Sequence, residues 1–143
     1  MEKSIRVLAV DDFEPFRVWV RSTLEQLPAL QVIGEAWDGM EAVQKAAALL
    51  PDLILLDIGL PTLNGIEAAR RIRRLSPASQ ILFVTQNISA DLAEEALRLG
   101  AAGYVVKSDA ASDLLPAVEA VLAGRQFVSA RLAARELPCG CAP

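Results

Sequence analysis

Short apolar runs alternate along this chain with longer stretches in which apolar residues recur every three or four positions. The short runs predict buried strands near residues 5–10, 31–36, 52–57, 80–85 and 103–106. The longer stretches predict amphipathic helices near residues 14–27, 39–49, 64–75, 89–99 and 111–123. Such an alternation is typical of an α/β fold, in which helices cover both faces of a parallel sheet.

Polar residues mark the starts of several predicted helices. Asp38, Asn64 and Ser89 each stand directly before a helical stretch. A short side chain that carries an oxygen atom can cap the free N–H groups there. Either Ser112 or Asp109 can do the same for the last helix.

Polar side chains also stand at the ends of four predicted strands. Asp11 and Asp12 follow the first strand and Asp57 ends the third, whereas Thr85 and Lys107 stand at the ends of the fourth and fifth. The carboxyl ends of parallel strands meet at one edge of a sheet, where ligands bind in folds of this class. We therefore expect these side chains to form one site.

This set of side chains suits a divalent cation and a phosphoryl group. A hard cation such as Mg²⁺ would relieve the repulsion among Asp11, Asp12 and Asp57. Lys107 and Thr85 can stabilise the non-bridging oxygens of a phosphoryl group. With charge withdrawn in this way, the Asp57 carboxylate is a competent nucleophile that would form an acyl phosphate.

Composition narrows the range of functions. The 143 residues suffice for one domain with a substantial core, and 53% of them are hydrophobic. The formal net charge of −4 argues against non-specific nucleic-acid binding. The absence of histidine excludes an imidazole nucleophile, an imidazole metal ligand and a phosphohistidine on this chain. Any phosphoryl chemistry must therefore use carboxylates.

The sequence predicts neither an export signal nor a membrane-spanning helix. Its apolar stretches are far shorter than the roughly 20 residues that a membrane helix needs. Its only cysteines, Cys139 and Cys141, suggest no disulfide framework and are too few for a zinc site, which needs about four ligands. We expect a cytoplasmic protein without a membrane partner and with an inert C-terminal tail.

The chain resembles the CheY-like receiver domain of two-component response regulators over residues 3–128. The resemblance is carried by the Asp11-Asp12 pair, Asp57 in LLDIGLP, Thr85, Lys107 in GYVVK, Pro61, Gly65 and the GAAGY turn at Gly100–Tyr104. It implies a flavodoxin-like (βα)5 fold, which is a doubly wound parallel sheet of five strands in the order 2-1-3-4-5.

The stretch GYVVKSDAASDLLPAVEAVLAGRQFVS looks most like receivers of the NarL/LuxR transcription-factor class. In that class a helix-turn-helix domain follows the receiver. Residues 129–143, interpreted as an exit segment or tail with a short helix near 130–136, are too few for such a domain. The chain is therefore either a single-domain regulator or part of a longer protein, and DNA is a partner only if an output domain lies outside this chain.

The resemblance also implies roles for the site residues. Asp57 would accept phosphate from a sensor histidine kinase or a phosphotransfer protein, assisted by Lys107. Asp12, Asp57 and the backbone carbonyl of Gly59 would bind Mg²⁺ directly, and Asp11 would act through water. Such a protein is not an enzyme towards other substrates, because it catalyses only its own phosphorylation and dephosphorylation.

The signal would then spread from the site to the surface. Thr85 would follow the phosphoryl group, and Tyr104 would change rotamer with it. We expect activation-linked homodimerisation through the last two helices and the strand at 103–106.

Two other functions compete with this interpretation. One is an interaction module that keeps the fold but works without phosphorylation, although the intact acidic cluster speaks against it. The other is a phosphatase of the haloacid-dehalogenase type, which also uses a nucleophilic aspartate, a hydroxyl, a lysine and Mg²⁺. Its acid/base aspartate should lie two residues past the nucleophile, where this chain has Gly59.

Overall fold

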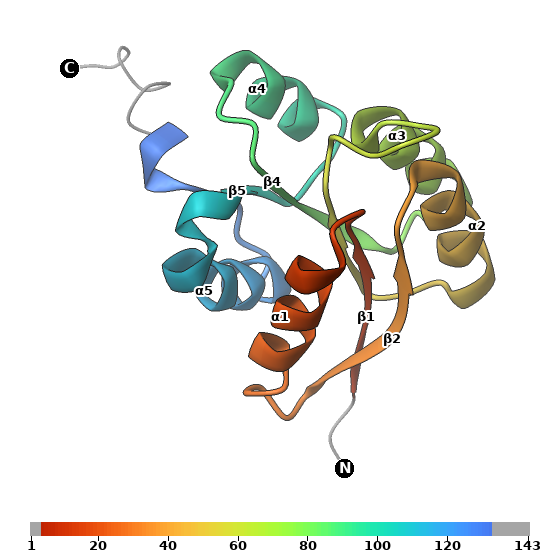
Figure 1. Ribbon diagram of the computed structural model, residues 1–143, viewed down its shortest axis with the longest axis horizontal. Helices are drawn as coiled ribbons and strands as arrows, with labels where there is room; N and C mark the ends of the chain where they lie inside the picture. The colour runs from red at the N-terminus through yellow and green to blue at the C-terminus, as the bar shows by residue number, and fades with distance from the viewer. Residues whose placement is uncertain (1–3, 133–143) are drawn as a thin grey trace.

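The computed structural model describes residues 4–132 and contains a six-stranded parallel sheet between two layers of helices (Figure 1). The strands are β1 (Ile5–Val10), β2 (Leu30–Ala36), β3 (Leu53–Leu56), β4 (Gln80–Thr85), β5 (Gly103–Val106) and β6 (Phe127–Val128). The helices are α1 (Glu14–Leu24), α2 (Gly39–Leu49), α3 (Gly65–Leu75), α4 (Ala90–Arg98) and α5 (Ala110–Leu122), with a short 3₁₀ helix, η1 (Lys107–Asp109), before α5.

The strands lie in the order β2-β1-β3-β4-β5-β6. The predicted order 2-1-3-4-5 is confirmed, but the prediction of five strands was one strand short. From β1 the chain first runs outward to β2 and then returns past β1 to β3, so the winding direction reverses between β1 and β3. In this pair Val10 lies opposite Leu56. The residues that follow these two strands, Asp11 and Asp57, are therefore brought to the same level of the sheet.

The sixth strand, Phe127–Val128, forms after α5, where the sequence analysis predicted no strand. Two backbone hydrogen bonds attach it to β5 and to the residue before that strand. They run from Phe127 N to Ala102 O (3.3 Å) and from Ser129 N to Tyr104 O (3.0 Å). Gly103 permits this close approach, because a Cβ atom there would lie 2.7 Å from Phe127 O. A strand of two residues has no periodicity of its own, which explains why the sequence pattern did not predict it.

The sheet separates two apolar layers (Figure 1). On one face α1 and α5 pack against the sheet, through residues such as Val20, Leu24 and Leu114. On the other face α2, α3 and α4 do so, with Ala46, Ile72 and other residues. Strands β3 and β5 are buried along their whole length, as expected for central strands of a parallel sheet covered on both sides.

The helix starts follow the predicted caps in three cases. Asp38, Asn64 and Ser89 each accept a hydrogen bond from the backbone N–H three residues further on, at 2.7, 3.0 and 3.2 Å. The prediction that Asp109 or Ser112 caps the start of α5 with its side chain was wrong. Asp109 occupies the cap position, but its carboxylate forms a two-pronged ion pair with Arg131, and Ser112 lies inside the helix.

The packed region continues beyond residue 128, where the sequence analysis expected the domain to end. Ser129 and Leu132 are fully buried, Leu132 among the residues of the apolar layer that contains α4. Residues 130–132 are helical, and the rest of the expected short C-terminal helix near 130–136 lies outside the described part of the chain, as do Cys139 and Cys141. Among residues 4–132, no helix combines the length and the apolar character needed to cross a bilayer.

Candidate functional site

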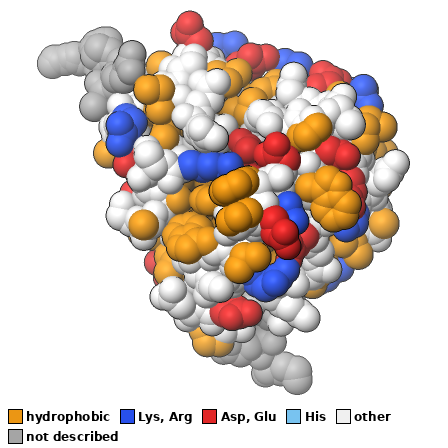
Figure 2. All heavy atoms as spheres, viewed as in Figure 1, with side chains coloured by type: hydrophobic (Ala, Val, Ile, Leu, Met, Phe, Trp, Pro, Cys, Tyr) orange, Lys and Arg blue, Asp and Glu red, His pale blue; other side chains and the backbone are white. Residues whose placement is uncertain are grey.

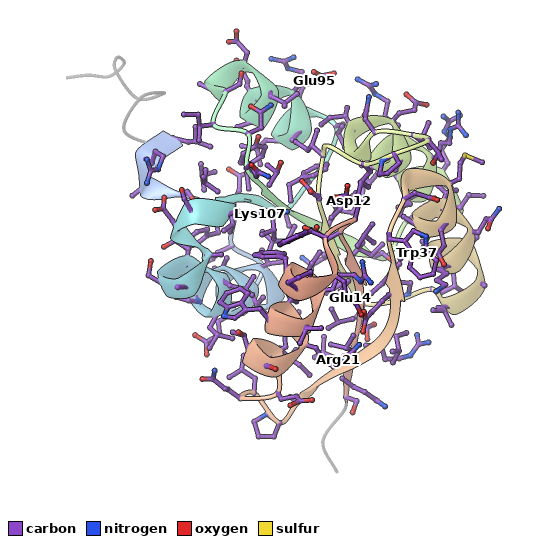
Figure 3. All side chains as sticks on the ribbon, viewed as in Figure 1. Asp12, Glu14, Arg21, Trp37, Glu95 and Lys107 are labelled. Atoms are coloured by element: carbon purple, nitrogen blue, oxygen red, sulfur yellow. The ribbon has the colours of Figure 1, made fainter. Side chains whose placement is uncertain are left out.

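The predicted site residues meet at the carboxyl edge of the sheet. Asp11 and Asp12 directly follow β1, Asp57 follows β3, Thr85 ends β4 and Lys107 follows β5. Figure 3 labels Asp12 and Lys107 at this edge, and Figure 2 shows acidic, basic and apolar side chains meeting in the middle of the same view. The sheet thus gathers residues from four separate strands.

Lys107 connects two of the carboxylates. Its Nζ atom lies 2.6 Å from Asp11 Oδ2 and 3.2 Å from Asp57 Oδ2, and its side chain is only 13% exposed. The ammonium group also lies 4.6 Å from the centre of the Phe16 ring, a cation–π distance. Burial by itself would lower the pKa of Lys107, but the hydrogen bonds and charges of Asp11 and Asp57 outweigh it and raise the pKa. The ammonium therefore stays charged at neutral pH.

Asp11 is held in an unfavourable environment for its charge. Burial raises the pKa of Asp11, and the nearby charge of Asp57 adds to the increase, although Lys107 and the backbone N–H of Phe13 oppose it. Asp11 Oδ1 accepts a hydrogen bond from Phe13 N at 2.8 Å. Asp11 Oδ2 is buried, and its partner is the Lys107 ammonium at 2.6 Å.

The carboxylates fit a hard cation. Oxygen atoms of Asp11, Asp12 and Asp57 lie within 4.8 Å of one another. Several carboxylate oxygens that converge in this way form the hard, anionic donor set that Mg²⁺ prefers in proteins. Asp12 is exposed, so the cluster can be reached from solvent.

Asp57 borders an open pocket. The residue is 6% exposed, and its Oδ1 atom accepts a hydrogen bond from Ile58 N at 2.7 Å. The pocket has a volume of about 360 Å³ and is lined by Asp12, Asp57, Ile58, Gly59, Thr85, Gln86 and Asn87. A Cβ atom on Gly59 would meet nothing within 4 Å, so this residue faces open space. The pocket can admit a group of phosphoryl size next to the Asp57 carboxylate.

Thr85 and Tyr104 are linked through one loop residue. Thr85 is 2% exposed, and its Oγ1 atom accepts a long hydrogen bond of 3.4 Å from Asn87 N. The fully buried Tyr104 donates from its hydroxyl to Asn87 O at 3.0 Å. Burial, with a contribution from the charge of Asp57, raises the pKa of Tyr104 to about 12. The loop between β4 and α4 therefore rests on the Tyr104 hydroxyl.

Sequence reasoning missed three residues that touch this site. Phe16 lies against the Lys107 ammonium, Arg17 donates to the backbone carbonyl of Asp11, and Asn87 bridges Thr85 and Tyr104. Phe16 and Arg17 belong to α1, whose pattern indicated only an amphipathic helix. Asn87 stands in a loop without a pattern, so nothing local distinguished it.

The topology and the acidic edge define a flavodoxin-like α/β domain. Its site lies where the order of strand addition reverses, between β1 and β3. The chain belongs to the response regulator receiver family, because the family model "Response regulator receiver domain" matches residues 7–119. This confirms the resemblance inferred from the sequence.

Individual relatives narrow the class. The chain is 35% identical over 129 residues to the response regulator GacA of Pseudomonas viridiflava, which covers 90% of this chain and 60% of the relative. It is 35% identical over 133 residues to the transcriptional regulatory protein LiaR of Bacillus subtilis, and the match covers 93% of this chain and 63% of LiaR. The chain thus spans about 60% of the length of these curated relatives. These relatives support the assignment of this chain to the NarL/LuxR class of receivers.

A solved structure gives the same assignment. The crystal structure of a LuxR-family two-component response regulator from Aurantimonas sp. SI85-9A1 is 37% identical, with a TM-score of 0.88 and coverage of 94% of this chain and 98% of that chain. The isolated receiver domain of RcsB from Salmonella enterica serovar Typhimurium, solved with the phosphomimetic BeF₃⁻, is 25% identical with a TM-score of 0.86, covering 92% and 98%. The chain is a two-component response regulator receiver of this class.

Proposed function

We propose that Asp57 is the phosphoacceptor of this receiver and that its phosphorylation switches the surface formed by α4, β5 and α5. The single observation that carries the proposal is that the Lys107 ammonium lies 3.2 Å from Oδ2 of Asp57, a carboxylate that lines an open pocket. A carboxylate in this position can attack a phosphoryl group while a fixed positive charge stands beside the reacting oxygens.

The reaction transfers one phosphoryl group. A carboxylate oxygen of Asp57 forms a bond to phosphorus as the bond to the donor breaks, and the donor leaves with the bonding electron pair. Lys107 stabilises the negative charge of the phosphoryl oxygens, and the Thr85 hydroxyl donates a hydrogen bond to one of them. In keeping with the receiver family, the donor would be a sensor histidine kinase or a phosphotransfer protein.

We propose Mg²⁺ as the cofactor. Asp12, Asp57 and the backbone carbonyl of Gly59 would hold it directly, with Asp11 acting through water, in keeping with the carboxylate cluster described above. When bound, the ion supplies positive charge that neutralises the carboxylates and the incoming phosphoryl group. The fold must hold these carboxylates close together although they repel one another. The Lys107 ammonium reduces that repulsion, because it pairs with Asp11 and Asp57.

The switch would use the link between Thr85, Asn87 and Tyr104. A hydrogen bond from Thr85 to a phosphoryl oxygen would draw the end of β4 towards Asp57. The loop at Asn87 rests on the Tyr104 hydroxyl, so its movement and a rotamer change of Tyr104 would accompany each other. The start of α4 follows directly, which would carry the change to the surface.

We propose that phosphorylation favours a homodimer and that the protein acts in the cytoplasm, in keeping with its family. One structure of RcsB, 25% identical to this chain, contains two RcsB dimers bound to two parallel DNAs. That protein extends beyond the part that matches this chain, which covers 67% of it. DNA binding would accordingly need an output domain outside this chain.

The test is labelling with a small phosphodonor, acetyl phosphate, in the presence of Mg²⁺. We expect the intact mass to rise by one phosphoryl group, the gain to disappear with EDTA, and Asp57→Asn to abolish it. Asp52→Asn is a matched control, because Asp52 stands at the opposite end of the same strand and binds the backbone N–H of Arg6. Sedimentation of the labelled protein reports the dimer.

Two outcomes would overturn the proposal. Equal labelling of wild type and Asp57→Asn would place the phosphoryl group elsewhere, and no labelling of wild type would favour an interaction module that works without phosphorylation. Steady turnover of phosphomonoesters would instead indicate a phosphatase of the haloacid-dehalogenase type, which the glycine at position 59 disfavours.

A further inference from the structure

Arg17 joins the acidic site to the neighbouring strand β2. Its Nη1 atom donates to the backbone carbonyl of Asp11 at 2.7 Å, and its Nε atom donates to Glu35 Oε1 at 3.1 Å. Its guanidinium carbon lies 5.7 Å from the centre of the Trp37 ring. The side chain is only 11% exposed. Three contacts therefore hold this guanidinium in one orientation, with one N–H aimed at the backbone of the site.

The bond to Asp11 affects the placement of Asp12. The Asp12 carboxylate is exposed and has no hydrogen bond among the described residues, so its position depends on the backbone on either side. The peptide before Asp12 is held by Arg17 through the Asp11 carbonyl. The peptide after Asp12 is held by the bond from Phe13 N to Asp11 Oδ1. Figure 3 shows Asp12 at the end of β1, with Trp37 across the neighbouring strand.

We propose that Arg17 is a positioning residue for the divalent cation, acting through the backbone of Asp11 and Asp12 rather than by touching the ion. The proposal rests on the cation site proposed above. Residues that orient metal ligands typically change metal affinity by about 10- to 100-fold when they are removed. We expect an effect at the lower end of this range, because Phe13 N still holds the other peptide.

The direction in which Arg17→Met changes the cation affinity distinguishes a positioning role from a purely electrostatic one. Arg17 is a positive charge beside a cluster that binds a cation, so its charge by itself repels the ion. If charge were its whole contribution, Arg17→Met would strengthen cation binding. If Arg17 positions Asp12, the same substitution weakens binding despite the removed repulsion.

Arg21 offers a matched control on the same helix. It forms an ion pair with Glu35, as Arg17 does, but its side chain is 47% exposed, and the hydrogen bond to the Asp11 carbonyl comes from Arg17. Arg21→Met thus removes the same charge and one partner of the same glutamate while leaving the Asp11 carbonyl bound. In Arg17→Met, Glu35 keeps Arg21 and the Trp37 ring keeps Lys45 at 5.9 Å, so neither group loses its last cation.

The experiment is a titration with Mn²⁺, a hard cation that binds the same oxygen ligands as Mg²⁺. The signal of the free ion in electron paramagnetic resonance gives the dissociation constant without any phosphorylation. We expect a dissociation constant about tenfold higher for Arg17→Met, an unchanged or lower one for Arg21→Met, and an intermediate one for Arg17→Lys, which keeps the charge but lacks the planar fork. Circular dichroism identifies any variant that fails to fold.

The outcomes distinguish this proposal from the proposed function. Wild-type protein that binds no Mn²⁺ would overturn the cation site and, with it, the role of Arg17. Binding by wild type together with equal or tighter binding by folded Arg17→Met would overturn only the positioning role. If Arg17→Met fails to fold, Arg17→Lys decides: a dissociation constant equal to that of wild type overturns the proposal, and a higher one supports it.

Discussion

The Lys107 ammonium lies 3.2 Å from Asp57 Oδ2, although 50 positions separate the two residues in the sequence. The same ammonium is 2.6 Å from Asp11 Oδ2. One positive charge therefore stands between two buried carboxylates that repel each other. The lysine charge offsets the repulsion between the two acids, so the site depends strongly on this single residue.

We expect Lys107→Met to lower the free energy of unfolding at neutral pH by about 3 kcal/mol, because it leaves buried carboxylates without a partner. The loss is expected to shrink as the pH falls and Asp11 takes up a proton. It is also expected to vanish at alkaline pH. The raised pKa of Lys107 means that its contribution is complete below its ordinary value of 10.5 and is lost as the pH rises through the raised value. Urea denaturation at several pH values measures this.

Two further variants sharpen the measurement. Lys45→Met removes a more exposed lysine, which pairs with Glu41 and donates to the backbone carbonyl of Glu35, and it should destabilise the protein less than Lys107→Met does. Adding Asp11→Asn to Lys107→Met should restore part of the lost stability, because it removes one of the unpaired charges. A double variant as unstable as Lys107→Met would contradict the electrostatic explanation.

Tyr104 is the only tyrosine of the chain, so its ionisation can be followed directly by ultraviolet absorbance. We expect a midpoint near pH 12 in the folded protein, because burial and the charge of Asp57 raise the pKa of Tyr104 from its ordinary value of 10.0. A phenol whose pKa is raised on folding stabilises the folded state below its ordinary pKa. This stability is lost as the pH rises from about 10 to about 12.

The control for this titration is Asp57→Asn, which removes the smaller of the two causes. Its Tyr104 midpoint should fall below that of wild type but stay above the ordinary value, because burial remains. A wild-type midpoint at the ordinary value would mean that the Tyr104 ring is solvated rather than inserted beneath the loop at Asn87.

Ser129→Ala is expected to lower the free energy of unfolding by about 1–3 kcal/mol. The Ser129 hydroxyl accepts a hydrogen bond from Val106 N at 2.9 Å and donates to Asp113 Oδ2 at 3.1 Å, and the residue is fully buried. Its removal leaves a buried N–H group unpaired directly before Lys107. Urea denaturation measures the loss, and faster hydrogen exchange of the Val106 amide would locate it.

Ser112→Ala is the matched control for this substitution. The Ser112 hydroxyl also lies near Asp113, at 3.4 Å from Oδ1, but it is on the exposed side of α5. Its removal should change the stability by no more than about 0.5 kcal/mol. Equal effects of the two substitutions would show that the buried hydrogen bonds of Ser129 contribute no more stability than an exposed hydroxyl does.

Much of this architecture was predictable from local patterns. Apolar runs that end at Asp11, Asp57 and Lys107 predicted both the strands and the edge at which their polar neighbours gather, because strands buried on both faces have few polar positions except at their ends. The caps Asp38 and Asn64 were predictable for a similar reason, since a cap bonds to a backbone group only three residues away.

Other features depend on contacts between distant segments and had no local signal. The pairing of β6 beside β5 needs the bare backbone of Gly103, and Asp109 turns from its cap position to a partner that follows β6, Arg131. The guanidinium of Arg17 reaches the Asp11 carbonyl only because α1 folds back along β1. Residue patterns report which positions are buried and how the backbone repeats, whereas the direction of a side chain and its partner are set when elements far apart in the chain pack together.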